Sequence, residues 1–193
     1  MNDIFETIED KKDLYTIITL KKEQVLFHEG DLCKEIGIIL QGQIAIISYM
    51  EDGRQIIFNR LNKSGIFGNN LLFSSEPYYK GNIIAMLDSR IALIKKEDLL
   101  KLLENDSAFM LEYLRILSDQ GKQLNFKIRL LSLDLARDRF YHYMHDHKNH
   151  IVIGSISELA SELFLSRETL SRLLNSLIRE KRIIKDGKHI TLL

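Results

Sequence analysis

The stretch from Ser155 to Ile184, SISELASELFLSRETLSRLLNSLIREKRII, constrains the fold of this chain more than any other. Ser155 is followed three residues later by Glu158, and this capping-box spacing marks the start of a helix. Leu159 and Leu163 then place two apolar side chains on one face of that helix, because residues four apart are neighbours on a helix surface. The beginning of the stretch therefore predicts a short amphipathic helix.

A second helix start follows after a turn made by Phe164 and Leu165. Ser166 can cap this helix, and four of its leucines share one face: Leu170, Leu173, Leu174 and Leu177. The opposite face is polar and carries Arg167, Glu168, Ser171 and Arg172. Two such helices joined by a tight turn predict a helix-turn-helix, whose second helix enters the major groove of DNA. A solvated polar helix face is the alternative interpretation of the same charges.

The run Ser166-Arg167-Glu168-Thr169, with Arg172 after it, resembles the start of the recognition helix in the CRP/FNR family of bacterial transcription regulators. The resemblance implies that six residues of this helix contact DNA: Ser166, Arg167, Glu168, Thr169, Ser171 and Arg172. Arg167, Glu168 and Arg172 are expected at base edges, because Arg pairs with guanine and Glu accepts from the cytosine amino group. Phe164 departs from the family, in which glycine is common in the turn, and a left-handed backbone would strain this side chain.

The charge of the chain is unevenly distributed although its formal net charge is zero. Residues 1–105 carry 13 Lys and Arg against 16 Asp and Glu, whereas residues 106–193 carry 14 against 11. The positive excess therefore lies in the half that contains the helix-turn-helix, where contacts with DNA phosphates would need it. The excess is small, so we expect modest non-specific DNA binding.

The sequence predicts a cytoplasmic protein without a metal cluster. No run of about 18 apolar residues is present, and the charged start of the chain lacks a signal-peptide core, so no membrane association is expected. Cys33 is the only cysteine, so it cannot form an internal disulfide or hold a four-cysteine iron–sulfur cluster. This separates the chain from the oxygen-sensing members of the family. Cys33 is interpreted as a semi-buried residue, with a redox-sensing thiol as the alternative.

Short apolar runs separated by turn residues recur from Gln24 to about Ile94, and this spacing predicts an all-β roll. Asp52-Gly53 is a signal for a hairpin with a two-residue turn. The family resemblance extends to this half in three segments: Glu29-Gly30-Asp31, Ile38-Ile39-Leu40-Gln41-Gly42 and Gly65-Ile66-Phe67-Gly68. These resemble the cyclic-nucleotide-binding type of β-roll.

The same resemblance argues against cyclic AMP as the ligand. Nucleotide-binding members carry a glutamate where this chain has Asn69, and an Arg-Ser pair where it has Tyr79-Lys80. Lys80 offers a point charge in place of a bidentate guanidinium. An unknown small effector is therefore expected at Gly68, Asn69, Asn70, Tyr79 and Lys80. A plain surface at these residues and a cyclic-nucleotide-responsive regulator both remain open as alternatives.

Small or apolar residues form an unbroken 4-3 repeat in the middle of the chain: Met110, Leu114, Leu117, Gly121, Leu124, Ile128 and Leu131. A helix with this stripe can pack on its own chain or pair with its copy as a coiled coil. The family uses this helix as its dimer interface, so the resemblance favours a homodimer. Gly121 lowers helix propensity but permits close approach or a bend.

Two features follow this helix. Four histidines, His142, His145, His147 and His150, lie in a segment interpreted as an exposed helix end and linker, with a metal site as the alternative. The chain then closes with two strands around Asp186-Gly187, which predict a wing, with Lys185, Lys188 and His189 near phosphate.

The sequence as a whole predicts an α+β protein: an N-terminal antiparallel β-roll (a double-stranded β-helix) at 1–105, a dimerisation helix at 106–135 and a C-terminal winged helix-turn-helix at 136–193. Its expected function is binding of double-stranded DNA at a near-palindromic promoter as a homodimer, with RNA polymerase as a further expected partner and without catalysis, cofactor or metal. One rival is a cupin-type enzyme, which would need several histidines in the strands, whereas residues 1–105 hold only His28. The other is a regulatory nucleotide-binding module attached to a partner.

Overall fold

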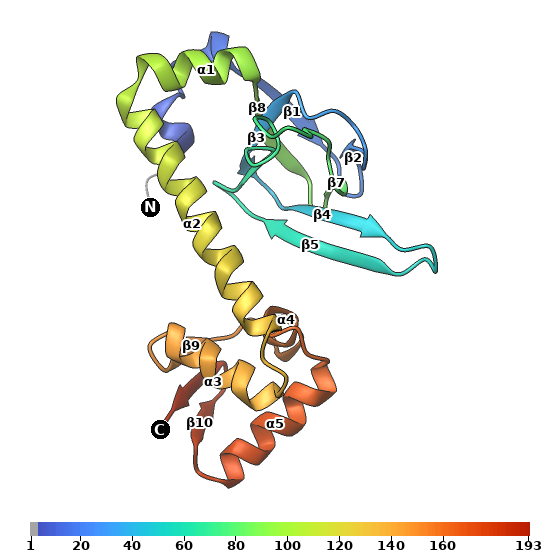
Figure 1. The fold of residues 1–193 in the computed structure, drawn as a ribbon, viewed down its shortest axis with the longest axis vertical. Helices are drawn as coiled ribbons and strands as arrows, with labels where there is room; N and C mark the ends of the chain where they lie inside the picture. The colour runs from blue at the N-terminus through green and yellow to red at the C-terminus, as the bar shows by residue number, and fades with distance from the viewer. Residues whose placement is uncertain (1–3) are drawn as a thin grey trace. The chain divides into compact units, whose positions relative to one another are not determined.

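The protein is described by a computed structural model that covers residues 4–193 and divides into two compact units. The first unit ends at Ser118, and the second is Asp119–Leu193. The division falls inside the long helix α2 (Ser107–Leu131), which is one unbroken element (Figure 1). Each unit has a hydrophobic core of its own.

The first unit is an antiparallel β-roll with short helices at both ends of its sequence. Its elements are η1 (Ile4–Thr7), η2 (Lys12–Leu14), β1 (Thr16–Leu20), β2 (Val25–Phe27), β3 (Glu35–Gln41), β4 (Ile44–Tyr49), β5 (Gln55–Leu61), β6 (Ile66–Phe67), β7 (Asn82–Ala85), β8 (Ser89–Lys95) and α1 (Lys96–Asn105). The strands form two four-stranded sheets, in the orders β1-β8-β3-β6 and β2-β7-β4-β5. The expected antiparallel β-roll is thereby confirmed.

Isoleucine-rich strands build the core of the roll. β3 and β8 pair along most of their length, and Ile36, Ile38, Ile91 and Ile94 are fully buried. Burial of one such side chain contributes about 1.5–3 kcal/mol, so these strands form the most strongly held part of the unit. β1 was not among the predicted elements, because it shows no alternation of apolar and polar residues. α1 was not predicted either.

The hairpin between β4 and β5 differs from the predicted two-residue turn. The Gly53 amide donates to the Met50 carbonyl at 2.9 Å, and the Met50 amide donates to the Arg54 carbonyl at 2.8 Å. Gly53 has a positive φ of 81°, whereas Asp52 does not. This is a three-residue loop of the type in which a turn is followed by one left-handed residue. The prediction was wrong because Asp52 stays right-handed, so only Gly53 uses its conformational freedom.

An aspartate joins the N-terminal segment to the start of α2. The Phe109 amide donates to Asp106 Oδ1 at 3.0 Å, and the other carboxylate oxygen pairs with the Lys11 ammonium. The hydrogen bond from Lys11, together with that from Phe109, holds the pKa of Asp106 below its usual value. Asp106 therefore acts as the N-cap of α2 and fixes residues that lie far apart in the sequence.

The second unit begins with the end of α2 and contains a winged helical domain. Its further elements are α3 (Ala136–Asp146), β9 (His150–Val152), α4 (Ile156–Glu162), α5 (Arg167–Arg179), β10 (Ile183–Asp186) and β11 (His189–Leu192). The three strands form one antiparallel sheet in the order β10-β11-β9. β9 was not predicted, because three residues carry no periodic signal and their partner strand lies at the end of the chain.

Part of the histidine tract packs against α2. Within the second unit the ring of Phe126 stacks on His142, with centroids 5.4 Å apart, and the ring of His147 stacks on Tyr143 at 4.1 Å. His142 is half-buried and lies on α3, while His150 lies on β9. The tract is therefore divided between a helix, a turn and a strand. No group of three or more potential metal ligands is found within residues 4–193.

Candidate nucleic-acid interface

The first helix of the helix-turn-helix starts where its cap was expected. Ser155 precedes α4, and its Oγ accepts a hydrogen bond from the Glu158 amide at 3.1 Å. This bond satisfies one of the backbone donors that every helix start leaves free. Leu159 and Leu163 are both buried in the core of the second unit. The local sequence thus determines both the start and the buried face of α4.

The turn between α4 and α5 is a Schellman motif built on a residue other than glycine. The Phe164 amide donates to the Ser161 carbonyl at 3.1 Å, and the Leu165 amide donates to the Ala160 carbonyl at 2.9 Å. Phe164 has a φ of 54°, the left-handed conformation that glycine adopts without strain. The sequence analysis expected strain at Phe164 if its backbone were left-handed, and the backbone has that conformation.

An arginine on α3 holds this turn. Arg139 donates from Nε to the Leu133 carbonyl at 2.7 Å and from Nη1 to the Phe164 carbonyl at 3.0 Å. One guanidinium therefore ties the segment before α3 to the turn before α5. The sequence analysis missed Arg139, because a lone arginine on a helix carries no signal for contacts with carbonyl groups distant in sequence.

The second helix of the motif, α5, is capped and buried as its sequence predicts. Ser166 Oγ accepts from the Thr169 amide at 3.0 Å and lies 2.8 Å from Thr169 Oγ1. Leu170, Leu174 and Leu177 are buried, and Leu173 is half-buried. Since the buried residues follow the helical repeat, α5 presents its other face to solvent.

The exposed face of α5 carries charged side chains that form no ion pair with the described residues. The exposed residues are Arg167, Glu168, Ser171 and Arg172, and Ser166 and Thr169 are also exposed. Glu168 and Arg172 are four residues apart on one face, but they form no ion pair. Within the described part of the chain, neither Arg167 nor Arg172 has an ion-pair partner. Both guanidinium groups keep all their donors available for a ligand.

The wing lies beside this helix in the same unit. β10 and β11 pair from Ile183 to Leu192, and the turn between them is Gly187-Lys188. Lys185 donates to the Gly187 carbonyl at 2.8 Å, so its ammonium stabilises the tip of the wing itself. Lys188 and His189 are exposed. The wing therefore carries exposed cationic and polar groups of its own.

The residues predicted to bind an effector divide into a buried and an exposed group. Gly68, Asn69 and Tyr79 are buried, whereas Asn70 and Lys80 are exposed. The Asn69 carbonyl accepts from the Tyr113 hydroxyl of α2 at 3.5 Å. The structure thus places Tyr79 in the core of the roll, where it stacks on Phe27 with ring centroids 4.8 Å apart.

A buried polar pair lies under this turn. Cys33 Sγ is 3.4 Å from the Glu35 carbonyl oxygen and 3.6 Å from the Gly68 carbonyl oxygen. Burial raises the pKa of the Cys33 thiol and the pKa of the neighbouring Tyr79 hydroxyl. The Tyr79 hydroxyl is buried, and no described residue meets it in hydrogen-bond geometry. The pair is therefore neutral at physiological pH, and its thiol is in the unreactive protonated form.

The predicted dimer stripe is an exposed apolar face of α2. Leu114, Leu124, Ile128 and Leu131 are each at least half exposed, with Leu124 at 59%. Phe126 and Leu130 point elsewhere, because Phe126 contacts α3 and Leu130 is buried. Gly121 is exposed, and a Cβ added there would meet nothing within 4 Å. Met110 and Leu117, by contrast, are half-buried, and Leu117 packs against the core of the roll, so the stripe is uncovered at Leu114 and from Gly121 onward.

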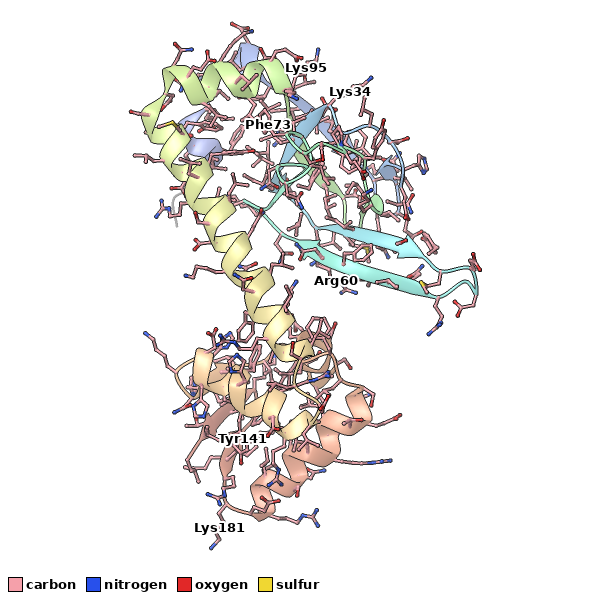
Figure 2. The ribbon with its side chains drawn as sticks, in the orientation of Figure 1. Lys34, Arg60, Phe73, Lys95, Tyr141 and Lys181 are labelled. Carbon is pink, nitrogen blue, oxygen red and sulfur yellow. The ribbon has the colours of Figure 1, made fainter. Side chains whose placement is uncertain are left out.

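Across residues 4–193, no helix combines the length and apolar character needed to cross a bilayer. Figure 2 shows two side chains of the second unit, the half-exposed Tyr141 and the exposed Lys181. Lys181 lies just after α5 and has a positive φ of 56°. Lys181 ends α5 with the same left-handed geometry that Phe164 gives to the end of α4.

The chain is similar to known regulatory proteins. Residues 17–106 match the cyclic nucleotide-binding domain family. The "Anaerobic regulatory protein" of Bacillus subtilis (strain 168) is 27% identical over 194 residues, covering 95% of this chain and 80% of that protein.

Two solved structures show the same fold over nearly the whole chain. A CooA mutant from Carboxydothermus hydrogenoformans is similar with a TM-score of 0.74 and 16% identity, covering 99% of this chain and 91% of that one. The catabolite activator protein of Thermus thermophilus is similar with a TM-score of 0.59 and 19% identity, covering 100% and 94%. The chain therefore resembles the CRP/FNR family of transcription regulators, with a β-roll that matches the cyclic nucleotide-binding domain family and is followed by a winged helix-turn-helix, and it lacks the cysteine cluster of FNR.

Proposed function

We propose that this protein binds a specific, near-palindromic DNA site as a homodimer and regulates transcription there. The observation that carries this proposal is the exposed face of α5, on which Arg167 and Arg172 have no ion-pair partner among residues 4–193, while Leu170, Leu174 and Leu177 opposite are buried. A major groove about 12 Å wide admits one such helix, and its N-terminal side chains meet the base edges. Arg167, Glu168 and Arg172 would read bases, and Ser166, Thr169 and Ser171 would lie closer to the backbone.

The exposed stripe on α2 supports the homodimer. An apolar face of this length is typical of a helix that pairs with a copy of itself, because isolated monomers rarely expose contiguous apolar patches. The interface would contain Met110, Leu114, Leu117, Gly121, Leu124, Ile128 and Leu131. A two-fold dimer would present its two copies of α5 about 34 Å apart, which is one turn of DNA.

We further propose that a small effector other than cyclic AMP controls this activity. Asn69 and Tyr79 are buried, and neither supplies the carboxylate or guanidinium that the family uses for a cyclic nucleotide. A cyclic-nucleotide-responsive regulator is the alternative. The same proposal divides the chain into a sensor domain at 1–105, a dimerisation helix at 106–135 and a DNA-binding domain at 136–193. It also includes a location in the cytoplasm, a contact with RNA polymerase, and the absence of catalysis and of metal.

Selection of DNA from a random library tests the proposal. The purified, ligand-free protein would be compared with Arg172→Ala at a fixed salt concentration of about 0.15 M, because phosphate contacts are salt-dependent. Arg179→Ala is the matched control, since Arg179 is an exposed arginine at the other end of the same helix. We expect wild type and Arg179→Ala to enrich one symmetric site, and Arg172→Ala to lose the preference while keeping its fold and dimer.

Two results would contradict the assignment of α5. One is an unchanged site selected by Arg172→Ala, and the other is unfolding of that variant. If wild type enriches nothing but binds DNA in a salt-sensitive way, the ligand-free form is an off state and the selection is repeated with candidate effectors. If it binds no DNA at low salt, the proposal fails.

A further inference from the structure

A groove of about 330 Å³ opens on the first unit, where the N-terminal segment meets the sheet that contains β1, β8 and β3. Its apolar lining comes from Phe5, Tyr15, Ile17 and Leu40. The rings of Phe5 and Tyr15 meet edge to face, with centroids 5.2 Å apart and planes at 69°. Ile17 is 43% exposed, so apolar surface is available to a ligand. The volume is at the lower end of the range for small-molecule sites.

The polar lining of this groove is predominantly cationic. Lys12, Lys63 and Arg90 line it together with one carboxylate, Glu9. All four side chains are exposed, and none of the three cations has an ion-pair partner within residues 4–193. Elsewhere in the unit, by contrast, Lys11, Lys21 and Lys101 each pair with an aspartate. The groove therefore carries an excess of unneutralised positive charge, which attracts anions.

The backbone holds these groups in fixed positions. Arg90 lies on β8 between two neighbouring strands, opposite Thr19 on one side and Gln41 on the other. The turn that carries Lys63 is attached to β3, because the Ser64 amide donates to the Ile39 carbonyl at 2.8 Å.

The aromatic wall is fixed in a similar way. The Tyr15 hydroxyl donates to the Glu9 carbonyl at 2.9 Å, which holds the ring of Tyr15 against the N-terminal segment. The apolar side chains and the three cationic side chains that line the groove are thus held in place before any ligand binds. Preorganisation of this kind lowers the entropic cost of binding.

We propose that this groove binds an aromatic anion, a small molecule with a flat apolar ring and a carboxylate or phosphate group. The ring would lie on Ile17 and Leu40 beside Tyr15, and the anionic group would meet Lys63 and Arg90. Arg90 can hold a carboxylate or phosphate with two parallel hydrogen bonds. The site shares no residue with α5 or with the predicted effector residues, so this inference does not rest on the proposed DNA binding.

Calorimetric titration of the full chain tests the inference with four probes that separate ring from charge. 1-Naphthyl phosphate and 1-naphthoate carry both, 1-naphthalenemethanol carries only the ring, and inorganic phosphate carries only the charge. We expect binding by the first two, with the phosphate ester tighter, and binding at least about tenfold weaker by the other two, because each half alone lacks one set of contacts.

Three substitutions identify the site. Arg90→Gln and Lys63→Gln should each weaken 1-naphthyl phosphate by about tenfold, the size expected for loss of one charged hydrogen bond. Lys34→Gln is the matched control. Lys34 is an exposed lysine directly before β3, shown in Figure 2, and it does not line the groove. It should change the affinity less than about twofold, because screened charges at a distance contribute little.

Circular dichroism and melting curves would establish that each variant is folded. The inference is overturned if no heat is detected at about 1 mM 1-naphthyl phosphate, a level that would detect even weak ligands. It is also overturned if the alcohol binds as well as the phosphate, or if Lys34→Gln weakens binding as much as Arg90→Gln does. None of these results would bear on DNA selection by α5.

Discussion

Arg139 on α3 donates a hydrogen bond from Nη1 to the carbonyl oxygen of Phe164, the residue that turns the chain between α4 and α5, at 3.0 Å. The same guanidinium donates from Nε to the Leu133 carbonyl at 2.7 Å. Phe164 is in the left-handed conformation, so its carbonyl lies outside the hydrogen bonding of α4. Arg139 gives that carbonyl a partner and so fixes the direction in which α5 leaves the turn.

Replacement of Arg139 by lysine should destabilise the second unit. A lysine ammonium is a single point and cannot donate to both carbonyls in the fork geometry of a guanidinium, so we expect a loss of about 1–3 kcal/mol in the free energy of unfolding. Urea unfolding followed by circular dichroism measures this. Arg137→Lys is the control, because Arg137 forms only an exposed pair with Glu180. Equal stability of the two variants would contradict the role of Arg139.

Glycine at position 164 should relieve the strain of the turn. Phe164→Gly and Phe164→Ala both remove the half-exposed ring, but only the alanine variant keeps a Cβ at a φ of 54°. We expect the glycine variant to be more stable than the alanine variant by about 1 kcal/mol, although glycine is more flexible when unfolded. Thermal unfolding of the two proteins provides the comparison. A more stable alanine variant would show that the turn is not left-handed.

A charge in the apolar stripe of α2 should dissociate the proposed homodimer. Leu124 is 59% exposed in the single chain, so Leu124→Glu should leave the fold intact but bury an unpaired carboxylate in the dimer. Sedimentation equilibrium should show a shift from dimer to monomer. Gln123→Glu adds the same charge one position away, outside the 4-3 repeat, and should remain dimeric. Dimers of both variants would exclude this face as the interface.

Asp106 should make stability depend on pH in the acid range. Its folded pKa is lowered by Lys11 and by the Phe109 amide, so the folded state binds the proton less readily than the unfolded state. The carboxylate therefore contributes stability above its ordinary pKa of about 3.9, and that contribution is lost as the pH falls through the lowered folded value.

Comparison of Asp106→Asn with wild type isolates this effect. The difference in their urea midpoints should be largest near neutral pH and should shrink below about pH 4, because protonation then removes the charge from the wild type as well. Glu104→Gln, which alters an exposed carboxylate that forms no ion pair with any described residue, serves as the control. A difference that stays constant down to about pH 2 would contradict the ion pair with Lys11.

The features that the sequence predicted depend on neighbouring residues. Ser155 and Ser166 cap the helices that follow them, and the leucines of α5 are spaced by the helical repeat, so residues within one or two turns determine these structures. The face of Arg167 and Arg172 could be predicted for the same reason, because the buried face of a helix also defines its exposed one. Phe164 was identified as strained because few residues adopt a left-handed backbone.

The features that were missed depend on residues far apart in the chain. β9 exists because it pairs with β11, and Arg139 is important because two carbonyls from other segments converge on it. The groove with Arg90 and Lys63 is assembled from the N-terminal segment, three strands and a turn, which no local pattern relates to one another. The Asp52-Gly53 signal located the hairpin but not its loop length, since a two-residue turn and a three-residue loop can both contain this dipeptide.

Cys33 has a practical consequence. It is the only cysteine of the chain, it is 3% exposed, and burial raises the pKa of its thiol, so maleimide reagents should not reach or react with it in the folded protein. A cysteine introduced at an exposed position, such as Leu124 or Ser171, would then be the only site that a dye or spin label modifies. Distances between two copies of the chain, or between the chain and labelled DNA, could be measured without first replacing a native thiol.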